Sequence, residues 1–402
     1  MMFASRTNWR LDPNRFTQAL EEHRRSGKQI LDLTVSNPTE CGFVYPEQEI
    51  LAALGDTRSF AYRPESKGLR EAREAVAAYY SGRIGFARTD KAINQGRIDP
   101  EHIVLTSGTS EAYSHIFRLL CEPGDEILVP EPSYPLFEFL ADLADIRLVP
   151  YTLLYDHGWQ IDFGSLRAAL TPRSRAVMVV HPNNPTGSFV KPREAAELVE
   201  ICASREMAIV ADEVFLDYSA GSEPAQTFAL SDGALTFTLS GLSKISLLPQ
   251  MKLAWTVVSG PKALVQTAIE RLEIIADTYL SPGAPVQLAL PKFLALRNGL
   301  QAQLQDRVLA NLSVLDNALG ESKLLSRLNR EGGWYAILRV PATQTDEALA
   351  VVLLQRCSVL VHPGHFFNFP HDGFIVLSLI TPEDGFHEGV RLLLEFFGAD
   401  EA

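Results

Sequence analysis

The chain has 402 residues and a formal net charge of -13 at pH 7, and 46% of its residues are hydrophobic while 21% are charged. This length predicts about two domains, and the composition is ordinary for a globular protein. The strongly negative charge disfavours nucleic acid or an anionic membrane as a partner, because both need a basic surface. The four cysteines are far apart and form no Cys-x-x-Cys pair, so we expect reduced thiols and no metal cluster or disulfide framework.

The N-terminal residues lack the apolar stretch of a signal peptide. No apolar run in the sequence approaches the roughly 18 residues that a membrane span needs. We therefore expect a cytoplasmic protein with no membrane partner.

From about residue 100 the chain alternates between short apolar runs and helical stretches. Runs rich in β-branched and aromatic residues predict strands, and we expect them at 102–105, 126–129, 146–149, 176–180, 208–210 and 235–239. Helices are expected over 112–120 and 194–205, the second with Pro192 near its start. Such alternation is typical of an α/β fold, with a mainly parallel sheet covered by helices on both faces.

A turn-rich patch at 281–285 interrupts this alternation. Beyond it the sequence predicts a smaller α+β domain, with a long helix over about 287–319, strands at 334–338 and 374–379, and a helix over 346–356. The first 50 residues lack the alternation and are expected to pack with this part. The expected organisation is a large domain over residues 51–284 and a small domain made of 1–50 and 285–402.

Polar residues follow three of the expected strands. Asn184 lies in the turn after 176–180, Asp212 ends the run that begins at 208, and Lys244 lies just beyond 235–239. Ligands in open α/β sheets bind beyond the carboxyl ends of the strands, so we expect these side chains to meet. An amine, a carboxylate and an amide together are what pyridoxal phosphate chemistry requires.

Each of these three residues has its own place in that chemistry. A lysine amine forms a Schiff base with an aldehyde cofactor and afterwards moves a proton. A carboxylate beside the pyridine nitrogen keeps it protonated and makes the ring an electron sink. An amide donates to the phenolate oxygen. Taken alone, Lys244 also fits a surface lysine, Asp212 a helix or turn cap, and Asn184 an ordinary Asn-Pro turn.

Two further segments fit an aromatic, phosphorylated ligand. Ser107-Gly108-Thr109-Ser110 lies between a strand and a helix, and helix N-termini attract anions. Gly108 allows close approach, while Thr109 and Ser110 add hydroxyls, although a plain helix cap is an equally simple explanation. Tyr134 follows the strand at 126–129 and is placed to stack on a ring or to pack in the core.

In this order the segments resemble the class I (class I/II) aminotransferases, pyridoxal-phosphate enzymes of fold type I, over nearly the whole chain. The resemblance implies an aspartate-aminotransferase-like fold and pyridoxal 5'-phosphate as cofactor. It assigns catalysis to Lys244 and Asp212. The residues it assigns to cofactor binding are Tyr62, Gly108, Thr109, Ser110, Tyr134, Asn184, Asp212, Ser243, Lys244 and Lys252.

The resemblance also implies the reaction. An amino group moves between an amino acid and a 2-oxo acid through a Schiff base on Lys244. Once released, Lys244 carries the proton between substrate and cofactor. The family is homodimeric with shared active sites, and Tyr62, ahead of Gly68-Leu69-Arg70, corresponds to a tyrosine that reaches the phosphate in the neighbouring subunit.

Three positions depart from the family pattern. Lys252 replaces an arginine on the phosphate, and a lysine lacks the bidentate fork. Phe215 replaces a tyrosine that donates to the cofactor phenolate, so we expect a raised pKa for the Schiff base. Val376 replaces the arginine that binds the substrate α-carboxylate, and the candidates to substitute for it are Arg63, Lys67, Arg339 and His365.

Val376 keeps two alternatives open on the same fold, a carbon–sulfur β-lyase and a transaminase for an amine that lacks the α-carboxylate. A ligand-sensing module of a transcription regulator is disfavoured, because little chain precedes the first motif near Ser36 and the charge is negative. A catalytically inactive homologue is disfavoured because Lys244 and Asp212 are both present. The sequence does not identify the amino donor or acceptor.

Overall fold

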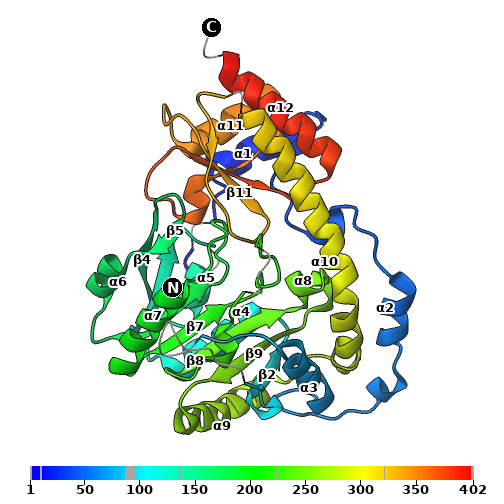
Figure 1. The fold of residues 1–402 in the computed structure, drawn as a ribbon, viewed down its shortest axis with the longest axis vertical. Helices are drawn as coiled ribbons and strands as arrows, with labels where there is room; N and C mark the ends of the chain where they lie inside the picture. Colours follow the sequence, from blue (N-terminus) through cyan, green and yellow to red (C-terminus); the bar gives the residue numbers. More distant parts are fainter. Residues whose placement is uncertain are drawn as a thin grey trace.

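A computed structural model describes residues 2–9, 11–86, 96–135, 137–221, 225–320 and 322–399. Its centre is an eight-stranded sheet in the order β2-β9-β8-β7-β6-β3-β4-β5 (Figure 1). The strands are β2 (Ile103–Thr106), β3 (Glu126–Glu131), β4 (Arg147–Tyr155), β5 (Trp159–Ile161), β6 (Ser174–Val180), β7 (Ala208–Asp212), β8 (Thr236–Gly241) and β9 (Ala254–Ser259). Neighbours from β8 to β4 pair in parallel, whereas β9 and β5 run antiparallel to theirs. The expected mainly parallel α/β sheet is confirmed.

Helices cover both faces of this sheet because its central strands are apolar on both sides. The helices around it are α3 (Arg70–Tyr79), α4 (Thr109–Leu120), α5 (Phe137–Leu143), α6 (Phe163–Ala169), α7 (Pro192–Ser204), α8 (Leu242–Ile245) and α9 (Lys262–Tyr279). Successive residues of a strand point to opposite faces. Val177 accordingly shares a core with residues of α7, while Met178 shares one with residues of α4 and α9.

A second group of strands lies above the large sheet in Figure 1. β10 (Ser326–Arg327), β11 (Tyr335–Arg339), β14 (Phe374–Ser378) and β13 (His362–Pro363) form an antiparallel sheet in that order. β1 (Leu31–Asp32) pairs in parallel with β12 (Val359–Leu360). Helices α1 (Arg15–Arg25), α11 (Asp346–Cys357) and α12 (Glu383–Ala399) pack here, α1 against α11. Within the first 50 residues, α1 and β1 therefore contact the C-terminal part of the chain.

One long helix connects the two groups. α10 (Ala284–Leu319) contacts α2 (Glu47–Leu54), α3 and α8 beside the large sheet, and α12 near its other end (Figure 1). The expected helix over 287–319 is thus confirmed, and it starts three residues earlier. Because α10 contacts both groups, the domain boundaries at residues 50 and 285 stay predictions.

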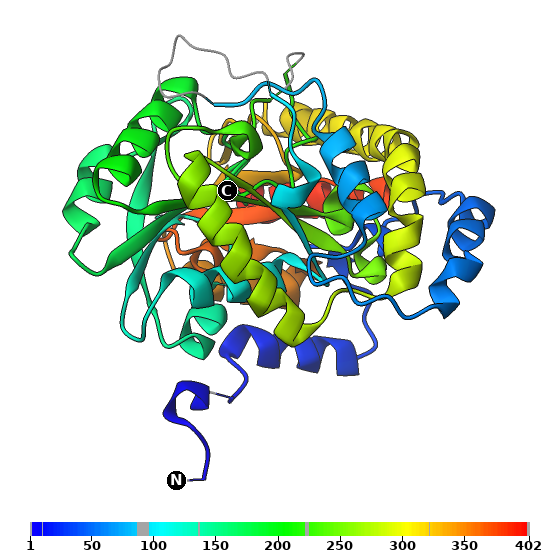
Figure 2. The same ribbon diagram turned by 90° about the horizontal axis from the view of Figure 1, so that it is seen from below.

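The start of the chain lies at the periphery of the molecule (Figure 2). Trp9 packs edge-on against Phe139 of α5 at 5.5 Å, and its indole N–H donates to Asp142 at 2.8 Å. Within the described residues, no helix combines the length and the apolar character that crossing a membrane requires.

Candidate functional site

Three of the predicted residues lie at or beyond the carboxyl ends of neighbouring strands of the large sheet. Asp212 is the last residue of β7 and pairs in register with Val180, where β6 ends. Asn184 lies in the loop after β6, and Lys244 lies in α8, which directly follows β8. Parallel pairing of these strands places the three following segments on one side, as the sequence predicts.

Lys244 is half-buried beneath aromatic rings. Its ammonium nitrogen lies 4.9 Å from the centre of the Trp334 ring and 5.6 Å from that of Phe215. Burial lowers the pKa of Lys244 to about 8, while the negative charge of Asp212 opposes that shift. Burial disfavours the charged ammonium, so a substantial share of the amine is neutral near pH 8. A neutral amine is the form that attacks a carbonyl.

Asp212 is buried at the strand end. Oδ2 accepts a hydrogen bond of 2.7 Å from the hydroxyl of Tyr113, and Oδ1 accepts one of 3.1 Å from the backbone N–H of Val214. Burial raises the pKa of this carboxyl group, while these two hydrogen bonds and the charge of Lys244 oppose the rise. Sequence reasoning missed Tyr113. The available signal was its position on the helix that begins at the predicted anion site, four residues beyond Thr109.

The N-terminus of α4 faces a lysine. The helix begins at Thr109 with Gly108 as its cap, and a Cβ at Gly108 would lie 3.8 Å from the ammonium nitrogen of Lys252. Within the described residues Lys252 forms no ion pair, and the hydroxyls of Thr109 and Ser110 form no hydrogen bond. Unpaired helix amides, two free hydroxyls and an ammonium group together suit a phosphate.

Asn184 presents an unsatisfied amide. The residue is buried, and its Oδ1 has no hydrogen-bond partner among the described residues. The neighbouring Asn183 is fully engaged, because it bonds to Ser133, to the backbone of Pro132 and to Thr186. Leaving a buried amide atom unpaired costs about 1–3 kcal/mol. Amide oxygen and nitrogen exchange places on flipping the side chain, so Asn184 suits a polar group of a ligand as donor or acceptor.

Tyr134 and Ser243 flank this group. Tyr134 follows β3 and is 43% exposed. Burial raises the pKa of its phenol, and the charge of Asp212 adds to the rise, so the two side chains lie within electrostatic reach. Ser243 precedes Lys244 on α8 and is half-buried. Tyr134 and Ser243 thus lie in segments that follow β3 and β8, and their contacts with a ligand stay predictions.

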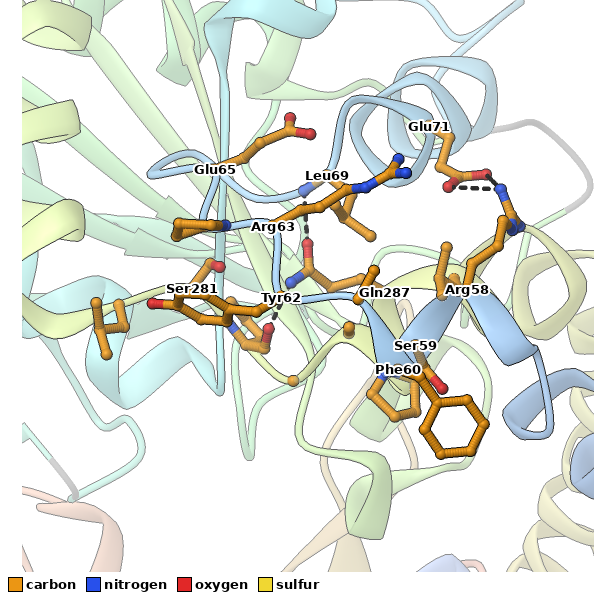
Figure 3. Close-up of a pocket in the computed structure, with 18 of the residues that line it drawn as sticks. Arg58, Ser59, Phe60, Tyr62, Arg63, Glu65, Leu69, Glu71, Ser281 and Gln287 are labelled. Atoms are coloured by element: carbon orange, nitrogen blue, oxygen red, sulfur yellow. Dashed lines mark hydrogen bonds and ion pairs between the residues drawn. The ribbon is translucent and has the colours of Figure 1, made fainter.

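Tyr62 lies apart from the other predicted site residues. It is 80% exposed and lines a cavity of about 360 Å³ together with Phe60, Arg63, Leu280 and Gln287 (Figure 3). None of the other predicted cofactor-binding residues lines this cavity. Within one chain, Tyr62 therefore does not join the group around Lys244.

No cation occupies the strand that carries the arginine in the family. Val376 is fully buried in β14 and pairs with Ile337 and His362. Every residue from Phe374 to Ser378 is buried and uncharged. No position of β14 therefore carries a cation, whichever of them is aligned with the family's arginine.

The four candidates to replace this arginine differ in their contacts. Lys67 is engaged, because its ammonium lies 2.6 Å from Glu101 and 3.8 Å from Glu273. His365 packs against Phe366 at 4.7 Å. Arg63 and Arg339 are exposed and form no ion pair with a described residue. None of the four is placed beside Lys244 by a described contact.

Comparison with known proteins identifies relatives along most of the chain. Residues 28–384 match the family described as aminotransferase class I and II. Alanine aminotransferase of Mycobacterium tuberculosis H37Rv is 28% identical over 359 residues, covering 86% of this chain and 80% of that protein. Glutamate-pyruvate aminotransferase AlaA of Escherichia coli K12 is 27% identical over 376 residues, covering 91% and 90% respectively.

Solved structures share the fold. An alanine aminotransferase from Pyrococcus furiosus superposes with a TM-score of 0.85 at 23% identity and covers 95% of each chain. An aminotransferase from Escherichia coli gives a TM-score of 0.83 at 26% identity, covering 99% of this chain and 98% of that one. These likenesses extend through both groups of strands.

Proposed function

Because the chain belongs to the class I and II aminotransferases, we propose that it binds pyridoxal 5'-phosphate in the site around Lys244. The chain is an aminotransferase, which moves an amino group between an amino acid and a 2-oxo acid. When bound, the cofactor supplies an aldehyde for the amino group and a ring that accepts electrons. The observation that carries the proposal is that the buried Asp212 and the half-buried Lys244 lie at or just beyond the carboxyl ends of the neighbouring parallel strands β7 and β8.

The residues present fit the cofactor at both of its ends. Lys252 and the start of α4 supply positive charge and free donors for the phosphate, with Thr109 and Ser110 as hydroxyl partners. The ionised carboxylate of Asp212 would accept a hydrogen bond from a protonated ring nitrogen. With its side chain flipped, Asn184 would donate an amide N–H to the ring oxygen.

Lys244 is the catalytic base in this proposal. Its lowered pKa leaves a neutral amine that can take a proton from the substrate α-carbon and deliver it to the cofactor. The rings of Trp334 and Phe215 keep water from one side of the amine and stabilise its ammonium form by cation–π contact. Both forms of the lysine are thus accessible near neutral pH.

We also propose a homodimer with shared active sites. Phe60, Tyr62 and Leu280 are 91%, 80% and 60% exposed around the cavity of Figure 3, and exposed apolar clusters of this kind mark interaction surfaces. A second copy seated there brings Tyr62 to the phosphate in the neighbouring subunit. The cytoplasmic location expected from the sequence stays a prediction.

The amino donor is tested by a single-turnover absorbance screen of the cofactor-loaded protein. Alanine and glutamate come first, because relatives are named for alanine and for glutamate and pyruvate. Loss of the visible band at ~420 nm, with the band of the aminated cofactor appearing, establishes a donor. Lys244→Ala is expected to lose both the visible band and turnover. Full activity in that variant would refute the site.

Val376 favours a second candidate reaction, because β14 lacks the cation that holds an α-carboxylate. That candidate is a carbon–sulfur β-lyase on the same fold. Release of pyruvate and ammonia from a thioether amino acid, without an amino acceptor, supports the lyase. If no standard amino acid converts the cofactor, amines without an α-carboxylate are the next substrates to test.

A further inference from the structure

Tyr113 contacts the candidate site from α4, on the face of the sheet that this helix covers. Its ring is buried, packing edge-on against Phe137 at 5.2 Å and tilted against Phe117 at 6.0 Å. Its hydroxyl donates a hydrogen bond of 2.7 Å to Oδ2 of Asp212. Since the ring is held by packing, the direction of this donor is fixed by the fold.

The phenol of Tyr113 acts only as a donor to the carboxylate. Burial and the adjacent charge of Asp212 raise the pKa of Tyr113 well above its usual range. The hydroxyl therefore keeps its proton at any physiological pH. A carboxylate offers about four lone-pair sites on two oxygens, and Tyr113 and Val214 take one site on each oxygen. Room remains on Asp212 for a third donor.

We propose that Tyr113 is a positioning residue, whose hydroxyl orients the carboxylate of Asp212 and stabilises its ionised form, so that the cofactor ring nitrogen keeps its proton. This inference rests on the proposed function, in which Asp212 faces that nitrogen. A proton shared by a carboxylate and a pyridine nitrogen resides on whichever of the two groups is the more basic within the protein site. A hydrogen bond donated to the carboxylate lowers its basicity, and the proton then stays on the ring.

The direct test is the state of the ring nitrogen. Tyr113→Phe keeps the packed ring and removes the donor. With ¹⁵N-labelled pyridoxal phosphate bound, we expect the ring-nitrogen chemical shift to move from the protonated toward the neutral value. We expect kcat to fall roughly tenfold, the effect of one charge-assisted hydrogen bond, with little change in KM.

Tyr151 provides a matched control. It is also a buried tyrosine of the large-sheet region, and its hydroxyl donates at 2.8 Å to the backbone oxygen of Met178. Tyr151→Phe removes one buried hydroxyl without touching Asp212. We expect its thermal stability to fall as in Tyr113→Phe while the ring-nitrogen shift stays at the wild-type value. Equal shifts in both variants would show a general loss of packing and would overturn the inference.

Asp212→Asn separates this inference from the proposed function. That variant is expected to give the neutral ring-nitrogen shift. If it does and Tyr113→Phe keeps the wild-type shift, Asp212 keeps its role and the inference about Tyr113 is wrong. If Asp212→Asn leaves the shift unchanged, the assignment of Asp212 itself fails, and the inference falls with it.

A fluorinated tyrosine introduced at position 113 covers the case in which Tyr113→Phe does not fold. Fluorination makes the phenol a stronger donor with little change in shape. At a fixed pH the ring-nitrogen chemical shift is then expected to lie at the protonated value or further toward it than in the wild-type protein. A chemical shift that moves toward the neutral value would refute the inference.

Discussion

At the residue scale, burial acts in opposite directions on the two charged groups of the site. It lowers the pKa of Lys244 to about 8 and raises that of Asp212, because desolvation disfavours the charged form of either group. Each charge opposes the shift of the other. The carboxylate has two further donors, Tyr113 and Val214, whereas the amine has aromatic faces instead of hydrogen-bond acceptors. This asymmetry favours an ionised aspartate beside a lysine that loses its proton readily.

The lowered pKa of Lys244 predicts the pH dependence of cofactor capture. In the cofactor-free protein the rate of reaction with pyridoxal phosphate should rise about tenfold per pH unit below pH ~8 and level off above it, since only the neutral amine attacks the aldehyde. Stopped-flow absorbance measures this rate. A lysine with the usual value of 10.5 would give a rate that keeps rising beyond pH ~9, which would contradict the prediction. Lys244→Ala serves as the blank.

At the scale of elements, the sequence predicted the helices and strands whose own residues show a clear hydrophobic pattern. The apolar runs that became β6, β7 and β8 were recognised because a parallel strand is buried on both faces. β5 was missed because its three residues are too few to carry a pattern, and β9 was missed although Ala254–Ser259 is an apolar run like those of β6 and β8. Lys252 lies in the short connection before β9, so its approach to α4 follows from the unpredicted pairing of β9.

The same distinction holds for the candidate site. Residues that directly follow predicted strands, such as Asp212 and Lys244, could be placed from the rule that parallel strands end at one edge. Tyr113 belongs to a helix and Trp334 directly precedes β11 of the other sheet, so their approach depends on how these elements pack. Periodicity alone gives the face of a helix but not the residue that the face meets.

Gln287 links the loop of Tyr62 to α10 and gives the element-scale prediction. Its Oε1 accepts a 2.6 Å hydrogen bond from Leu69 N–H, and its Nε2 donates to the backbone oxygen of Pro282 (Figure 3). Gln287→Leu leaves both backbone groups unpaired in a buried place, so unfolding free energy should fall by about 2 kcal/mol. Chemical denaturation measures this change.

Gln266 on α9 is the control for this substitution. Its side chain is exposed and bonds only to Glu270, one turn away, at 2.8 Å. Gln266→Leu should change the unfolding free energy by less than about 0.5 kcal/mol. Equal losses in the two variants would mean that the contacts of Gln287 do not stabilise the loop.

At the scale of the whole molecule, one chain does not gather all of the predicted site residues in one place. Nine of the ten predicted cofactor-binding residues lie along the sheet edge or the helices that begin there, while Tyr62 lines a separate cavity. Local sequence patterns identify Tyr62 as a candidate but cannot place it, because in the proposed dimer its position relative to Lys244 depends on a second copy. The exposed Phe60 and Leu280 beside it are the residues that such a copy would cover.

Mixed dimers test whether two subunits build each site. Lys244→Ala chains are inactive in this scheme, and Tyr62→Ala chains hold the cofactor weakly. In a dimer of one of each, the site that contains the intact Lys244 receives the intact Tyr62 from the other subunit. Unfolding and refolding equal amounts together should restore about a quarter of wild-type activity, since about half of the dimers are mixed and each has one complete site. If Tyr62 acts within its own chain, the site with the intact Lys244 still lacks Tyr62, and mixing does not restore activity. Size-exclusion chromatography of both parents checks that each variant still forms dimers.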